Sequence, residues 1–188
     1  SFTTRPSRTR ITRSARSVAR AIKRVLLEAV VDSDVGPLRV LTTHLEYYSV
    51  RQRGAQIDAL RDLHAQACDH AARPRLGKGE AGGTFEVFPR PASAILCGDM
   101  NFPAEAPERL RLLAPITGTP SFRDAWDIAQ PGQPHAPTVG IHPVGFVDRP
   151  SCFDFIFLTE DLAPRLRSLG IDSQTAASDH QPVWVELT

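Results

Sequence analysis

The sequence predicts one domain of class α/β (α+β), in which helices cover two sheets. Short apolar segments with strand-like alternation are separated by longer segments with helical periodicity. The stretch 153–158 is apolar on both faces except at Asp154, which is typical of a strand buried on both sides. Strands of this kind need helices or a second sheet to cover them. With 188 residues, the chain is long enough for a substantial core.

Two parts of different composition divide the chain. Residues 1–24 are basic throughout, and no acid precedes Glu28, whereas residues 25–188 have the composition of a folded domain. The first part has too few apolar residues to offset the cost of ordering, so we expect it to be disordered or atypical in structure. A nucleic-acid-binding arm, a transit-like peptide and a truncated or shifted reading frame would each give such a segment. The third explanation is favoured.

Bulk properties exclude several classes of protein. The formal net charge is +1, so overall charge does not indicate nucleic acid as a partner. The three cysteines have no paired spacing, which argues against disulfides and zinc and favours a reducing, cytoplasmic location. No apolar run approaches the ~20 residues that span a bilayer. A soluble monomer without a membrane span is the expectation.

The first elements form a hairpin followed by a helix. Residues 25–31 are an apolar strand, 32–37 are turn residues, and a second strand runs to His44. Ser49 has the form of a helix N-cap. The helix after it should bury a stripe of apolar residues and place the following polar residues in solvent: Arg53, Asp58, Arg61, His64 and His70.

Loops and a short helix make up much of the second half. Residues 73–92 read as a long loop, and a second helix is expected near Pro107–Leu113. Residues 131–150 read as a loop over the active face. Its two histidines, His135 and His142, are isolated and do not make a metal site, so they are left out of the predicted site.

Polar residues stand at the ends of the apolar strands. Asp99 and Asn101 are two residues apart after the run 94–97, so their side chains should share one cleft, and their oxygens suit a hard cation. His44 lies on one strand face with Thr42 and Glu46. The alternatives are turn chemistry for Asp99 and Asn101 and a purely structural role for His44.

Two further motifs add a carboxylate and an imidazole. Asp154 opens an otherwise apolar strand, where a carboxylate is costly without a partner. A histidine is the natural partner, because a buried Asp fixes the imidazole tautomer and raises its basicity. Asp179 and His180 precede a terminal strand, where they can supply a metal ligand and a titrating group. A capped turn is the alternative.

Four motifs in chain order resemble those of the endonuclease/exonuclease/phosphatase superfamily, which is DNase I-like: His44, Asp99 with Asn101, Asp154, and Asp179 with His180. The resemblance extends over residues 25–188 and takes in further matching segments: Arg51–Gln52, Gln56, Asp124–Trp126 and Pro137–Thr138. It implies a four-layer α/β/β/α sandwich with the site at the strand ends. That sandwich should be incomplete at its N-terminus.

The resemblance also implies a function, namely metal-dependent hydrolysis of phosphate esters by a phosphodiesterase or nuclease-like enzyme. Asp179 and Asp99 would hold Mg²⁺ or Mn²⁺, and Asp99 with Asn101 would place water or phosphate. His180, oriented by Asp154, would act as general base, and His44 would donate to a phosphate oxygen or the leaving group. The substrate would be a phosphate ester, with nucleic acid as one option.

The chain also departs from the family. The metal-facing Asn and the metal-binding Glu that precede the His strand in the family have no match here. We therefore expect little activity from this chain. A catalytically inactive truncated remnant, or a protein that binds phosphate or nucleic acid through the basic start, is the alternative function.

Overall fold

The computed structural model describes residues 10–12, 24–73, 89–143, 147 and 149–188. Strands β2 (Leu26–Ser33) and β3 (Gly36–His44) form the predicted hairpin, which closes where Ser33 pairs with Gly36. A strand that the sequence did not predict, β1 (Arg10–Thr12), pairs antiparallel with β2. Apart from residues 10–12 and 24, the segment 1–24, for which we expected disorder, lies outside the described residues.

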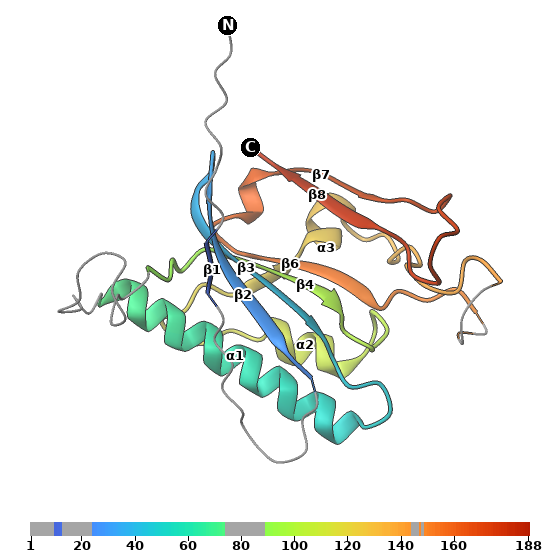
Figure 1. Ribbon diagram of the computed structural model, residues 1–188, viewed down its shortest axis with the longest axis horizontal. Helices are drawn as coiled ribbons and strands as arrows, with labels where there is room; N and C mark the ends of the chain where they lie inside the picture. The colour runs from blue at the N-terminus through green and yellow to red at the C-terminus, as the bar shows by residue number, and fades with distance from the viewer. Residues whose placement is uncertain (1–9, 13–23, 74–88, 144–146, 148) are drawn as a thin grey trace, which may run out of the picture.

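A six-stranded sheet in the order β1-β2-β3-β4-β6-β5 forms the centre of the molecule (Figure 1). Strands β4 (Ala94–Asp99), β5 (Phe122–Asp124) and β6 (Asp154–Thr159) complete it. β3 and β4 are parallel, and the other neighbours are antiparallel. The parallel pair needs a crossover, which the long helix α1 (Val50–Ala72) provides.

Helices α1 and α2 (Pro107–Leu113) cover one face of this sheet (Figure 1). Their apolar side chains share a core with the strand residues that point the same way, including Leu41, Leu96 and Phe157. Since α2 has the predicted bounds, the prediction of a helix at this place is confirmed.

A second layer covers the opposite face. It consists of the short helix α3 (Ala125–Ala129), the 3-10 turn η1 (Ala163–Arg165) and the antiparallel pair β7 (Leu166–Ile171) and β8 (Val183–Leu187). Leu158 and Leu162 form the core between the layers. Helices, sheet and second sheet are thus present as predicted, and the outer face of β7–β8 exposes Trp184 and Glu186.

The N-cap at Ser49 is confirmed, because the backbone N–H of Gln52 donates to its hydroxyl at 3.2 Å. The solvent position predicted for Arg53 is wrong. This side chain is only 7 % exposed, donates to the carbonyl of Glu46 at 3.0 Å and forms an ion pair with Glu108 of α2 at 2.9 Å. Arg53 therefore ties the start of α1 to both the loop after β3 and to α2.

The prediction that His64 lies on the polar face of the helix is also wrong. His64 is 2 % exposed and lies between Arg39 and Pro120. Its Nε2 donates to the Pro120 carbonyl at 2.8 Å, and its Nδ1 accepts from the Arg39 guanidinium at 2.7 Å. Burial, followed by the positive charge of Arg39, lowers the pKa of His64 in spite of the Pro120 hydrogen bond.

Arg39 is itself completely buried and lies in the first half of β3, away from His44. It donates to the Pro91 carbonyl at 2.7 Å and pairs with Glu28, which also receives two hydrogen bonds from Arg90, each at 2.8 Å. This ionic network is fully partnered, as buried charges require. It joins β2, β3, α1 and the segment before β4.

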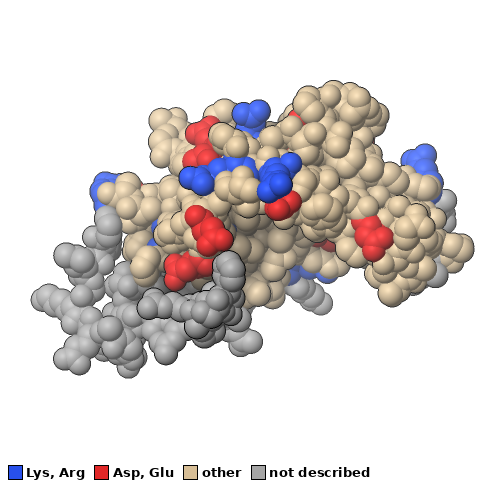
Figure 2. All heavy atoms as spheres, turned by 90° about the horizontal axis from the view of Figure 1, so that it is seen from above, with Lys and Arg blue, Asp and Glu red and all other residues tan. Residues whose placement is uncertain are grey.

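The surface has no dominant charge in the view from above. Figure 2 shows acidic and basic side chains interspersed on that face, in keeping with a net charge of +1. Among the residues that the structure describes, no helix combines the length and apolar character needed to cross a membrane.

Candidate active site

The ends of three neighbouring strands bring the predicted site residues together. In the sheet register, His44 of β3 pairs with Asp99 of β4, and Asp99 pairs with Asp154 of β6. Gly98 allows this alignment, because its φ is +137° and a Cβ there would lie 1.9 Å from the Thr43 carbonyl oxygen. Three sequence motifs that are far apart in the chain therefore meet at one edge of the sheet.

Asp99 lies at the centre of the group. Its Oδ1 accepts the backbone N–H of Asn101 at 2.9 Å. Its Oδ2 lies 3.4 Å from His44 Nε2 and 3.9 Å from His180 Nε2. Burial, and then the negative charge of Asp154, raise the pKa of Asp99, while the Asn101 hydrogen bond and the two imidazoles oppose the rise.

Asn101 connects two loops of the site by a hydrogen bond. It is buried at a φ of +52°, a left-handed conformation that asparagine tolerates better than most residues. Its side-chain N–H donates to the Leu45 carbonyl at 2.8 Å. The amide thereby joins the loop that follows Asp99 to the loop that follows His44.

The predicted pairing of Asp154 with His180 is present. Nδ1 of His180 lies 2.8 Å from Asp154 Oδ2, and the His180 side chain is 33 % exposed. Burial lowers the pKa of His180, but the Asp154 hydrogen bond and the charges of Asp154, Asp99 and Asp179 outweigh it, so the pKa is raised overall. The imidazole lies between two carboxylates, with its Nε2 directed toward Asp99.

Asp179 lies at the same edge but in an exposed loop. The one hydrogen bond of its carboxylate within the described part of the chain comes from the Ser178 hydroxyl at 3.4 Å. Asp99 and Asp179 supply carboxylate oxygens, the donors that Mg²⁺ and Mn²⁺ prefer. Mg²⁺ is commonly bound by one or two carboxylates, with water and substrate phosphate completing its shell. The donor chemistry of these two residues fits such an ion.

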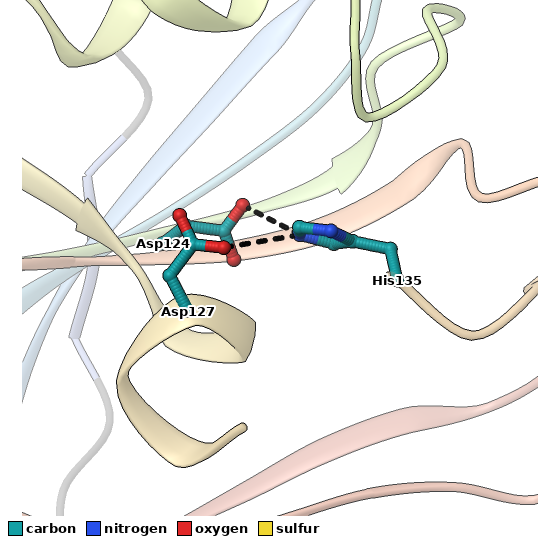
Figure 3. Close-up of side chains that lie close together, drawn as sticks. All are labelled: Asp124, Asp127 and His135. Atoms are coloured by element: carbon teal, nitrogen blue, oxygen red, sulfur yellow. Dashed lines mark hydrogen bonds and ion pairs between the residues drawn. The ribbon is translucent and has the colours of Figure 1, made fainter. Parts of the chain in front are cut away.

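A second polar cluster, which the sequence analysis did not single out as a site, joins Asp124, Asp127 and His135 (Figure 3). His135 Nε2 lies 3.1 Å from Asp124 Oδ2, and the same oxygen accepts from Arg109 Nε at 2.8 Å. Arg109 also pairs with Asp127, and Asp124 Oδ1 caps α3 by accepting from Trp126. Since a cation already holds both carboxylates, we interpret the cluster as structural.

This cluster and Asp154 line the same small cavity. Its walls include Asp124, His135, Cys152 and Asp154. Burial, followed by the charges of Asp124 and Asp154, raises the pKa of the Cys152 thiol to about 12, so the thiol stays neutral. No sequence signal identified His135, because it stands alone in a loop rich in proline.

Comparisons with known proteins agree with the fold. No protein-family model and no curated protein matches the sequence. An endonuclease/exonuclease/phosphatase from Bacteroides vulgatus has a similar structure, with a TM-score of 0.60 and 16% identity, over 88% of this chain and 56% of that one. The mannosyl-6-phosphatase Bt3783 of Bacteroides thetaiotaomicron gives 0.58 and 17%, over 88% and 57%.

A third similar structure is that of D. rerio TDP2 complexed with a single strand DNA product, with a TM-score of 0.55 and 20% identity, over 86% of this chain and 60% of that one. The chain thus has the fold of the endonuclease/exonuclease/phosphatase proteins, which confirms the predicted DNase I-like architecture. It spans a little over half the length of these three structures.

Proposed function

We propose that this protein hydrolyses phosphate esters with the help of a divalent cation. The observation that carries the proposal is the register of β3, β4 and β6, which aligns His44, Asp99 and Asp154 and sets the Asp154–His180 pair beside Asp99. The fold supports it, because similar structures include a mannosyl-6-phosphatase and a protein complexed with a DNA product. The substrate class is therefore a phosphomonoester or phosphodiester.

In the proposed reaction, His180, His44 and Asp99 would have different roles. His180 accepts a proton from water at Nε2, while Asp154 at 2.8 Å holds its Nδ1–H and stabilises the imidazolium that forms. His44, the most exposed of these groups, donates to a phosphate oxygen or to the leaving group. Asp99, held by the N–H of Asn101, accepts hydrogen bonds from the attacking water.

Asp179 and Asp99 would hold Mg²⁺ or Mn²⁺, which when bound neutralises the charge that develops on the phosphate oxygens. Such neutralisation is needed because phosphate oxygens repel an incoming nucleophile. The imidazoles of His44 and His180 both lie within 4 Å of Asp99, and each would add to this neutralisation when protonated.

The test is a hydrolysis assay with p-nitrophenyl phosphate, bis(p-nitrophenyl) phosphate and single-stranded DNA, with and without Mg²⁺ or Mn²⁺. We expect wild type and H70N to hydrolyse the esters, and H180N and H44N to have no turnover. His70 is the control because it lies near the far end of α1, away from the strand ends. Absence of turnover on every ester, combined with retained binding of the same esters, would refute hydrolysis and favour a phosphate-binding protein.

A further inference from the structure

Thr138 connects the two segments that carry Asp154 and His180. It is completely buried. Its backbone N–H donates to the Ser151 carbonyl at 2.8 Å, and its carbonyl accepts from the N–H of Gln181 at 2.7 Å. The next residue, Val139, forms β-bridges with both Ser151 and His180. The backbone around Thr138 therefore fixes the distance between the two segments.

The direction of the Thr138 hydroxyl follows from its partners. Its Oγ1 lies 3.1 Å from the backbone nitrogen of Phe153 and 3.1 Å from that of Asp154. Both are N–H donors, so the hydroxyl oxygen accepts from them. Its single hydrogen is left for Asp154 Oδ2, at 2.7 Å. The hydroxyl thus makes three hydrogen bonds, and only one arrangement of its hydrogen satisfies all of them.

The same Asp154 oxygen also faces His180. Oδ2 accepts from the Thr138 hydroxyl at 2.7 Å and lies 2.8 Å from His180 Nδ1. A carboxylate oxygen can only accept, so Nδ1 carries a proton and Nε2 of the neutral imidazole is unprotonated. Two donors on one oxygen fix the carboxylate in position, and the carboxylate fixes the ring.

We propose that Thr138 is a positioning residue that acts through Asp154 and holds His180 in the Nδ1–H tautomer, with an unprotonated Nε2 that faces Asp99. Its effect on catalysis rests on the proposed function, but its effect on the tautomer does not. Because Thr138 is completely buried, it would touch neither substrate nor the attacking water. Partners of this kind, one step behind the reacting group, commonly change activity by about 10- to 100-fold when they are removed.

The variants are T138V, which keeps the shape but loses the hydroxyl, and T138S, which keeps the hydroxyl. The matched control is T159V. Thr159 is also completely buried, lies in β6 like Asp154, and accepts a backbone N–H from Ala94 at 3.0 Å. Both valine variants thus lose a buried hydroxyl that binds backbone, but only T138V loses the contact with Asp154. Thermal unfolding of each variant measures the common structural cost.

Histidine nitrogen NMR of the metal-free protein, at a pH at which the His180 imidazole is neutral, reports the tautomer without substrate. We expect Nδ1–H to dominate in wild type, T138S and T159V, and a mixture of tautomers in T138V. With an ester substrate, T138V should lower kcat by about 10- to 100-fold with little change in KM, and T138S should stay within about threefold of wild type. Should T138V not fold, T138A takes its place with the same expectations.

A double-mutant cycle measures whether the effect of Thr138 on kcat depends on Asp154. If Thr138 acts through Asp154, T138V should lower kcat by less than about twofold in the D154A background, because the oxygen that Thr138 contacts is absent there. An unchanged tautomer in T138V, equal losses in T138V and T159V, or full additivity with D154A would each overturn the proposal. Failure of wild type to hydrolyse any ester would count against the proposed function alone, since the tautomer is measured without it.

Discussion

Replacing Asp154 with Asn separates the charge of this residue from its geometry. The hydroxyl of Thr138 and Nδ1 of His180 both point to Oδ2, and within the described residues no hydrogen bond reaches Oδ1. An amide oxygen can occupy the Oδ2 position and accept both hydrogen bonds, while its NH₂ group takes the other place. The variant should therefore fold like wild type and lack only the negative charge beside the imidazole.

The size of the effect follows from the distance. Two unit charges about 4 Å apart interact by about 4 kcal/mol at an effective dielectric constant of about 20. Because the His180 side chain is 33 % exposed and that of Asp154 is 18 % exposed, solvent screening reduces this to about half. A loss of about 2 kcal/mol in the stabilisation of the imidazolium corresponds to about a 30-fold lower kcat, and the unscreened value sets a limit of about 1000-fold.

The assay is steady-state hydrolysis of bis(p-nitrophenyl) phosphate by wild type, D154N and the control D58N. Asp58 forms a surface ion pair with Arg111 between α1 and α2 and lies outside the strand-end cluster. We expect D154N to lower kcat about 30-fold or more with less than about a threefold change in KM, and D58N to leave both unchanged. A D154N variant with normal kcat and a raised KM would show that Asp154 serves substrate binding, and the reasoning would be wrong.

Three further outcomes are expected. G98A should destabilise the fold by about 3 kcal/mol or more, because its Cβ would lie 1.9 Å from the Thr43 carbonyl oxygen at a strained φ, whereas G36A, with open space around it, should cost only about 1–2 kcal/mol in urea unfolding. Burial beside Arg39 lowers the pKa of His64. The contribution of the neutral imidazole to the free energy of unfolding is therefore fully present above about pH 6.5 and is lost as the pH falls toward the folded-state pKa. Unfolding free energies measured between pH 7.5 and 5 should fall accordingly, and a flat profile would contradict this. Finally, chelation should abolish hydrolysis and Mg²⁺ or Mn²⁺ should restore it, whereas equal rates in EDTA would exclude the divalent-cation part of the proposal.

The strand ends of the site could be predicted because local sequence determines them. Alternation along each strand shows which residues share a face, and an apolar run that ends in a polar residue shows where the strand emerges from the core. Asp99 follows an apolar run, Asp154 opens one, and His44 ends its strand. The register of the sheet brings the three residues level. The remaining step, the pairing of His180 with Asp154, follows from the need of a half-buried carboxylate for a partner.

The buried side of α1 was only partly predictable. Polar residues were assigned to solvent by their type, but position in the helix decides burial. Arg53, Ile57, Leu60, His64 and Ala67 are three or four residues apart and all lie on the buried face. The spacing was thus a usable signal for His64. The partner of His64 could not be predicted from the spacing, because Arg39 contacts His64 only when the sheet and the helix are packed together.

The hydrogen-bond arrangement around the site depends still more on tertiary structure. Thr138 lies in an irregular segment, and no periodic pattern predicts that its hydroxyl meets two backbone N–H groups and a carboxylate. The same holds for Asn101, whose amide binds the Leu45 carbonyl across 56 residues of sequence. In both cases, the sequence resemblance indicated the residue, and only the structure shows what the side chain does.

The register that assembles the site also places two like charges opposite each other. Asp99 and Asp154 are direct neighbours in antiparallel strands, an arrangement that destabilises a sheet when both carboxylates are ionised. His180 lies between them, 2.8 Å from one and 3.9 Å from the other, and His44 lies 3.4 Å from Asp99. The imidazoles therefore offset a repulsion that the fold imposes. Burial is the main cause of the raised pKa of Asp99, and the charge of Asp154 adds to it. Asp154 also raises the pKa of His180, against the effect of burial, through its hydrogen bond and its charge. A divalent cation bound at Asp99 would offset the same repulsion, which is why the local conflict in the sheet supports the proposed chemistry.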